Sequence, residues 1–170
     1  MNIRAEKKED YLGIAQVHDL AFRRKNEGWL VAGLRATGRF IPKLSLVAEE
    51  QDRIFGHILF YPVWIINPTQ SFPTLSLAPM AVLPSYQKRG IGSLLMQKGI
   101  KEAARTDFNS VIVLGHPDFY KKFGFEKASR WNIRLPFEAP EEAFLALELK
   151  KDALTRASGV VQYPDAFKRV

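Results

Sequence analysis

The sequence predicts a mixed α/β domain, and three observations lead to this fold class. Segments with the helical spacing of apolar residues alternate along the chain with short β-branched strands. Hydrophobic residues make up 46% of the 170 residues, as in folded proteins. The length is that of one domain. We therefore expect a single domain over 1–170, with a core over 1–128 and C-terminal strands in a tail over 129–170.

Composition excludes several function classes. The chain has no cysteine, so disulfides, iron–sulfur clusters, thiolate zinc sites and cysteine nucleophiles are ruled out. The net charge is +7, but the cations form small groups such as 23–25 and 88–89 rather than a basic arm. We expect no nucleic-acid partner. The longest apolar run, 54–66, is shorter than the roughly 20 residues that span a bilayer, so we expect no membrane partner and a cytoplasmic location.

The first half of the chain reads as a strand, two helices and a hairpin. A strand is predicted over 2–5, followed by a helix with Asp10 as its N-cap and apolar residues at helical spacing through Phe22. A shorter helix is predicted over 27–35. Strands over 44–48 and from Ile54 onward enclose a polar turn, which indicates a hairpin.

A fourth strand is predicted over 74–82, and it contains Pro79. Proline lacks the N–H that a ladder requires, so within a sheet it marks an edge strand or a local break. If the strand is central, the break leaves main-chain groups free for a ligand. The sequence does not choose between these two interpretations.

The second half continues with a helix, a strand and a short helix. A long helix ends near Arg105, with an inner stripe formed by Ile91, Leu94, Leu95, Gly99 and Ala103. A β-branched strand is predicted over 110–114. Pro117 at a first turn and Gly124 at a stop define a short helix over 118–123. Residues 143–149 fit either a strand or a helix, and a strand is predicted over 160–163.

The segment 87–92, Gln-Lys-Arg-Gly-Ile-Gly, carries the clearest chemistry. Its glycines allow a ligand to approach the main chain and turn N–H groups to one side. The following helix N-terminus adds free donors, and Lys88 and Arg89 add charge, so a phosphate or diphosphate is predicted. The P-loop lysine and the third glycine of a dinucleotide fingerprint are both missing.

The pattern Gln-x-x-Gly-x-Gly resembles the acetyl-CoA loop of the GNAT (GCN5-related) N-acetyltransferases, in particular their bacterial YhbS-like branch. Residues 77–82 look like the family's fourth strand, and 119–125 look like its tyrosine-bearing fourth helix. The resemblance covers most of 1–125 and, weakly, the tail to 163. It implies a central, mostly antiparallel mixed sheet flanked by helices, with the fourth and fifth strands splayed. A common family asparagine after the fifth strand is replaced by the segment 115–118.

The resemblance also implies site residues. Main-chain groups of the fourth strand would line the pantetheine arm, and the loop would surround the diphosphate. The implied cofactor-binding residues are Met80, Ala81, Val82, Gln87, Lys88, Arg89, Gly90, Ile91, Gly92 and Ser93. Tyr120 is the implied catalytic acid for the departing thiolate, and no metal is expected.

The general base is left open by the sequence. Glu49, Glu50, His57 and His116 are chemically able to accept a proton, and a bound water is a further possibility. His57 in a hairpin is equally typical of a structural histidine. We name no base.

The implied function is N-acetyl transfer from acetyl-CoA to a primary amine by direct attack in a ternary complex. The acceptor, a small molecule or a peptide, cannot be read from the sequence, and the protein is expected as a monomer or homodimer. One alternative is a non-catalytic acyl-CoA-binding or regulatory domain of the same fold. A second is a nucleic-acid-binding module, although the scattered cations argue against it.

Overall fold

Two compact units make up the chain, and the computed structural model describes every residue from Met1 to Val170. The first unit contains Met1–Tyr61, Ala78–Glu102 and Asp165–Val170. The second contains Pro62–Leu77 and Ala103–Pro164. Strands β3 (Arg53–Ile66) and β4 (Ser71–Val82) contribute residues to both units.

The first unit is a sheet with helices on both faces. Besides its parts of β3 and β4, it contains β1 (Asn2–Ala5), α1 (Tyr11–Phe22), α2 (Asn26–Arg35), β2 (Ser45–Glu50) and nearly all of α3 (Ile91–Ala103). Its strands follow the order β1-β2-β3-β4. The pairs β1/β2 and β2/β3 are antiparallel, with Arg4 opposite Val47 and Val47 opposite His57. The predicted hairpin is confirmed, with its turn at Gln51 and Asp52, which both have positive φ.

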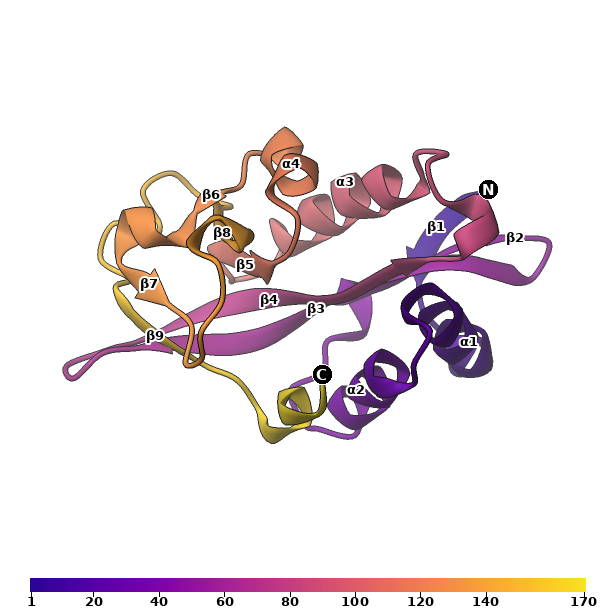
Figure 1. Cartoon of the computed structure of the whole chain (residues 1–170), viewed down its shortest axis with the longest axis horizontal. Coiled ribbons are helices and arrows are strands. Elements are labelled where there is room, and N and C mark those ends of the chain that lie inside the picture. The colour runs from indigo at the N-terminus through magenta and orange to yellow at the C-terminus, as the bar shows by residue number, and fades with distance from the viewer. The chain divides into compact units, whose positions relative to one another are not determined.

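Strand β3 separates the two helical layers of this unit. Successive side chains of a strand point to opposite faces. Phe60 lies against α3, whereas His57 contacts His18 of α1 and Tyr61 contacts Thr37 just after α2. Figure 1 shows the same arrangement, with α1 and α2 on one face of these strands and α3 on the other.

Helix α3 packs close to the sheet because Gly99 has no side chain. A Cβ atom at Gly99 would collide with the ring of Phe60, which is fully buried. Ile91, Leu95, Gly99 and Ala103 are buried as the predicted stripe requires. Leu94 is the exception: it is 43% exposed, and Met96 is buried in its place. The buried face of α3 therefore contains Met96, and Leu94 lies outside it.

The N-terminal end of α1 differs from the prediction. Asp10 precedes the helix, but its side chain makes no capping hydrogen bond. Instead its carboxylate accepts hydrogen bonds from Arg4 at 2.6 and 3.0 Å and from the Lys7 N–H at 2.7 Å. The aspartate therefore joins α1 to β1 rather than capping the helix.

The second unit is built around β5 (Ser110–Leu114). Strand β5 pairs in parallel with β4 through Leu75 and Ser76 and antiparallel with β8 (Phe144–Glu148), which in turn pairs with β6 (Glu126–Lys127). Strand β9 (Gly159–Gln162) pairs antiparallel with β3 and parallel with β7 (Ile133–Arg134). The segment that fitted either a strand or a helix is thus a strand, with Leu145 and Ala146 fully buried.

A short helical segment follows β5. Helix α4 (Pro117–Tyr120) begins at the proline, and a 3-10 turn (Lys121–Phe123) continues it to Gly124, whose φ is +91°. A left-handed residue is the usual helix terminator. Phe125 is then buried against the Tyr120 ring, at a centroid distance of 5.6 Å. The predicted proline start and glycine stop are confirmed.

We predict that Gly99→Ala destabilises the protein by about 1–3 kcal/mol, because the added methyl meets a buried ring that has no room to move. Chemical denaturation monitored by circular dichroism measures the change. Gly38→Ala is the matched control, since a Cβ at Gly38 would have no heavy atom within 4 Å. Equal stability of both variants would show that α3 does not depend on this close approach.

Candidate functional site

The loop between β4 and α3 is anchored at its start. The Leu83 N–H donates to the Phe55 carbonyl at 2.8 Å, and a 3-10 helix follows over Pro84–Tyr86. The Gln87 side-chain amide donates to the Val82 carbonyl at 3.0 Å. The Gln87 side chain thus binds the main chain of β4 and holds the loop against the end of this strand.

The middle of the loop turns through two left-handed residues, Lys88 with φ +60° and Gly90 with φ +82°. Glycine adopts such values without steric cost. A Cβ at Gly90 would meet no heavy atom within 4 Å, so the dihedral angle and not crowding explains the glycine. Successive amides in a turn of this kind point into a shared concavity that favours anions. Lys88, Arg89 and Gly90 are all exposed.

Helix α3 then supplies further donors. Its first main-chain hydrogen bond runs from the Leu94 N–H to the Gly90 carbonyl at 3.0 Å. The amides of Ile91, Gly92 and Ser93 precede this ladder, as the first amides of any helix do. Together with the positive end of the helix dipole they form an anion-binding terminus. The predicted loop residues are therefore brought together by local geometry.

The end of β4 lies beside this loop in the same unit. Ala81 is buried, while Met80 and Val82 are half-buried. The Val82 carbonyl is occupied by Gln87, and the Ala81 carbonyl faces Gly56 of β3. Pro79 is buried and follows a cis peptide bond. Strand β4 lies between β3 and β5 in the strand order, but its pairing with β5 covers only Leu75 and Ser76 and ends before Pro79.

Tyr120 belongs to the second unit and sits in an aromatic cluster. Its ring is 8% exposed and lies edge-on to Phe119 and Phe125, at centroid distances of 5.1 and 5.6 Å. Its hydroxyl has no hydrogen-bond partner within that unit. Burial raises the pKa of Tyr120 to about 12. The phenol is therefore protonated at neutral pH.

Gly115 sets the position of the Tyr120 ring, and sequence reasoning gave this glycine no role. A Cβ at Gly115 would lie 2.5 Å from a carbon of the ring. The ring therefore packs directly on the main chain that leaves β5. In the sequence, the only sign of this contact is a glycine five residues before a tyrosine, with a proline between them. Such a pattern is too common to predict the contact.

His57, one of the possible bases, is part of a buried polar network. The Ser45 hydroxyl donates to Glu6 at 2.5 Å, so it accepts from His57 Nε2 at 2.8 Å. Nδ1 of His57 is then the acceptor for Nε2 of His18 at 2.9 Å. Arg35 holds Glu6 with two hydrogen bonds of 2.7 and 3.0 Å.

This network keeps both histidines neutral. Burial lowers the pKa of His57 and lowers that of His18 well below its usual value. Burial alone would raise the pKa of Glu6, but hydrogen bonds from His57, Arg35 and Ser45 outweigh it and lower the pKa to about 2. Nδ1 of His18 is buried without a partner. Because both rings are completely buried, the network is structural and joins α1 and α2 to the sheet.

The other possible bases lie elsewhere. Glu49 accepts from Asn2 at 3.4 Å and lies 3.7 Å from the Arg4 guanidinium. Glu50 pairs with the N-terminal amine at 2.8 Å. His116 is exposed and precedes α4 in the second unit, where its carbonyl accepts the Phe119 N–H at 3.1 Å. None of these contacts positions Glu49, Glu50 or His116 as a general base.

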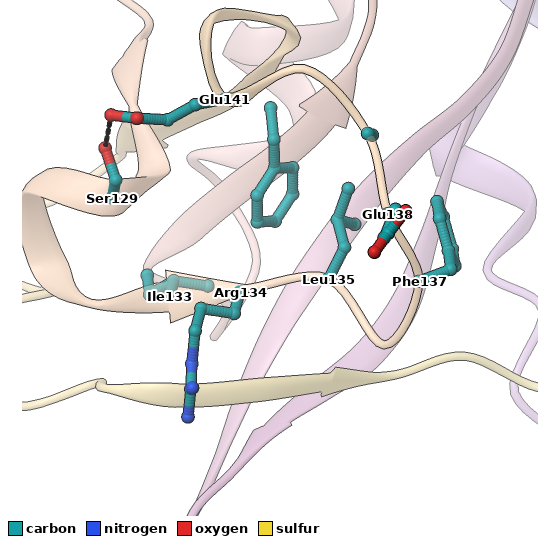
Figure 2. Close-up of a pocket in the computed structure, with 9 residues that line it drawn as sticks. Ser129, Ile133, Arg134, Leu135, Phe137, Glu138 and Glu141 are labelled. Carbon is teal, nitrogen blue, oxygen red and sulfur yellow. Dashed lines mark hydrogen bonds between the residues drawn. The ribbon is translucent and has the colours of Figure 1, made fainter.

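A pocket of about 600 Å³ opens in the second unit, and it contains none of the predicted site residues. Figure 2 shows Ser129 and Glu141 joined by a hydrogen bond of 2.8 Å, with Leu135, Phe137 and Glu138 on the segment that follows β7. No group of three or more metal-ligating side chains occurs in the chain, and no helix is long and apolar enough to span a membrane.

Comparison with known proteins identifies relatives along nearly the whole chain. The model of the acetyltransferase (GNAT) family matches residues 14–125. The chain is 30% identical over 169 residues to the uncharacterized N-acetyltransferase YhbS of Escherichia coli K12, and the match covers 99% of each chain.

Two solved structures extend this likeness. The crystal structure of YhbS from Escherichia coli in complex with CoA matches with a TM-score of 0.90 at 30% identity, over 99% of this chain and 92% of that one. A GNAT family acetyltransferase from Brucella melitensis in complex with acetyl-CoA matches with a TM-score of 0.78 at 32% identity, over 98% and 97% of the two chains. These matches confirm the predicted fold class.

We predict that stability falls as the pH drops below 6.5. An unfolded histidine titrates near pH 6.5, whereas His18 and His57 have lowered pKa values in the fold. The unfolded chain therefore binds more protons in this range. Each neutral histidine contributes a loss of roughly 1.4 kcal/mol per pH unit, and this loss is absent above the unfolded pKa. Urea denaturation between pH 7.5 and 5.5 measures the slope.

Two variants test the assignment of this slope. His18→Leu removes the ring with the unpartnered nitrogen and is expected to flatten the dependence. His116→Gln removes an exposed histidine and is expected to leave it unchanged. A slope that is the same in His18→Leu as in the unmodified protein would contradict the role given to the buried pair.

Proposed function

Because this chain belongs to the acetyltransferase (GNAT) family, we propose that it transfers the acetyl group of acetyl-CoA to a primary amine of a small molecule or peptide, by direct attack in a ternary complex. Relatives solved with CoA and acetyl-CoA support the choice of donor. The observation that carries the proposal is the left-handed corner at Lys88 and Gly90, which opens into the N-terminus of α3.

The loop is proposed to bind the diphosphate of the donor through main-chain groups. The amides of residues 88–93 stand at the corner and at the first turn of α3, where no helical acceptor serves Ile91, Gly92 or Ser93. A diphosphate there receives several N–H donors and the positive end of the helix dipole. Gln87 is proposed to keep the loop in register with β4 through its hydrogen bond to Val82.

Strand β4 is proposed to line the pantetheine arm with main-chain groups of Met80, Ala81 and Val82. An N–H of this segment would donate to the thioester oxygen as it gains negative charge. Fixed donors of this kind are often worth about 3 kcal/mol to a transition state. The half-buried position of Met80 and Val82 suits a surface that a ligand covers.

The acyl transfer forms one carbon–nitrogen bond and breaks one carbon–sulfur bond, and two proton transfers accompany it. The amine nitrogen bonds to the acetyl carbon, the carbon–sulfur bond breaks, and the sulfur leaves with the electron pair. Tyr120 is proposed to donate its phenolic proton to that thiolate, and the tyrosinate then regains a proton from solvent. Its raised pKa and unoccupied hydroxyl support this role, because the proton is present at neutral pH and is not committed to another acceptor.

The proton that the amine loses is assigned to water and not to a side chain. His57 and His18 are completely buried and already bonded to each other, so an amine does not reach them. Glu50 is paired with the N-terminal amine. We therefore propose no side-chain base for this chain.

The proposal is tested by measuring binding and turnover side by side. Calorimetry with acetyl-CoA reports donor binding, and thioester consumption against amino acids, polyamines, peptides and aminoglycosides reports transfer. Gly90→Val forces a β-branched residue into φ +82° and is expected to weaken donor binding at least about tenfold. Gly38→Val is the control, since its site is open and its φ is not left-handed. Binding without turnover for every amine would favour the non-catalytic alternative.

Tyr120→Phe is predicted to lower kcat about 100-fold while leaving acetyl-CoA affinity unchanged, because only the proton donor is lost. Steady-state kinetics with the best amine of the panel and calorimetry measure the two effects. Tyr163→Phe is the matched control: it is a second tyrosine of the same unit whose pKa is raised by burial. Unchanged turnover in Tyr120→Phe would remove Tyr120 from the mechanism.

A further inference from the structure

A cluster of two arginines and two aromatic rings borders the loop in the first unit. The ring of Tyr86 packs on that of Phe55 at a centroid distance of 4.3 Å. The Arg89 guanidinium lies over the Tyr86 ring at 5.1 Å, and the Arg53 guanidinium lies over it at 5.7 Å. One aromatic ring therefore orients two cations that are 36 residues apart in the sequence.

Neither guanidinium is neutralised by a carboxylate. Three other arginines of the same unit are paired: Arg4 with Asp10, Arg24 with Glu27 and Arg35 with Glu6. Arg53 and Arg89 make cation–π contacts but no ion pair. Glu50, the cross-strand neighbour of Arg53, pairs with the N-terminal amine instead. Two cations that contact one ring and lack a carboxylate partner attract an anion.

The position of the cluster ties it to the proposed diphosphate site. Arg89 directly precedes Gly90, and Tyr86 ends the 3-10 helix that leads into the corner. Arg53 begins β3, and the same end of β3 receives the loop through the hydrogen bond from Leu83 to Phe55. The corner and the two guanidinium groups are thus linked within one unit through the Tyr86 ring and the hydrogen bond from Leu83 to Phe55.

We propose that Arg53 and Arg89, oriented by Tyr86, bind the ribose 3′-phosphate of coenzyme A. This inference rests on the proposed function. Coenzyme A carries two anionic groups, the diphosphate and the 3′-phosphate, and the loop amides account for the first. Guanidinium groups bind phosphate oxygens through paired hydrogen bonds, which makes them suited to the second. The cluster would make the protein select coenzyme A over dephospho-coenzyme A.

The experiment is calorimetric titration of the full chain with coenzyme A and with dephospho-coenzyme A. The unmodified protein is expected to bind coenzyme A at least about tenfold more tightly. Arg53→Gln is expected to weaken coenzyme A binding and to leave dephospho-coenzyme A binding unchanged. Arg89→Gln, which lies in the diphosphate loop, is expected to weaken coenzyme A binding more than dephospho-coenzyme A binding, and the double variant is expected to lose the preference for coenzyme A. Lys101→Gln is the control, since it removes an exposed cation of α3 outside the cluster.

The outcomes separate this inference from the function on which it rests. Equal affinity of the unmodified protein for the two ligands would overturn the inference and leave donor binding intact. Selectivity that survives in the double variant would place the 3′-phosphate elsewhere and would also overturn it. A parallel loss of both ligands in the arginine variants would assign the guanidinium groups to the diphosphate. Binding of neither ligand by the unmodified protein would contradict the proposed function itself.

Discussion

The main-chain conformation at the start of α3 is the constraint on which the proposed binding of the acetyl donor depends. Two left-handed residues, Lys88 and Gly90, turn the chain before the helix begins, and Gly90 meets no neighbouring atom that would otherwise require a glycine. The residue type is therefore explained by backbone geometry alone. The amides of the corner precede the helical ladder, and the hydrogen bonds of Gln87 and Leu83 fix the corner to the end of the sheet.

Polar residues in the core of the first unit have a different purpose. Glu6, Ser45, His57 and His18 come from four separate segments and form one connected chain of hydrogen bonds, with Arg35 neutralising its only carboxylate. Buried polar groups are tolerated when they are paired, and here all but Nδ1 of His18 are. The histidine that a survey of titratable residues would choose as a base is therefore a structural element that joins both N-terminal helices to the sheet.

Charge in this protein is best understood locally. The net charge of +7 is divided among small groups, and three arginines of the first unit, Arg4, Arg24 and Arg35, are matched by carboxylates. Arg53 and Arg89 differ because an aromatic ring, and not an acid, holds them. A cation over a ring keeps its full charge and its N–H donors for an anion, whereas an ion pair neutralises the charge and uses part of the donors. This distinction separates a binding surface from solvated charge more clearly than composition does.

By itself the sequence determined the elements and the loop, because their signals are local. These signals act within a few residues: the positive φ at Gly90, the proline and glycine that bound the α4 segment, and the apolar periodicity of the strands. Only the tertiary structure decided which side chains are buried or meet across the fold. The exposure of Leu94, the end of the β4/β5 pairing before Pro79, the approach of Gly115 to Tyr120 and the shared contact of Arg53 and Arg89 with Tyr86 depend on strand register and close packing. Such contacts join residues distant in sequence or set the orientation of a helix on its sheet, and neither is encoded in a local pattern.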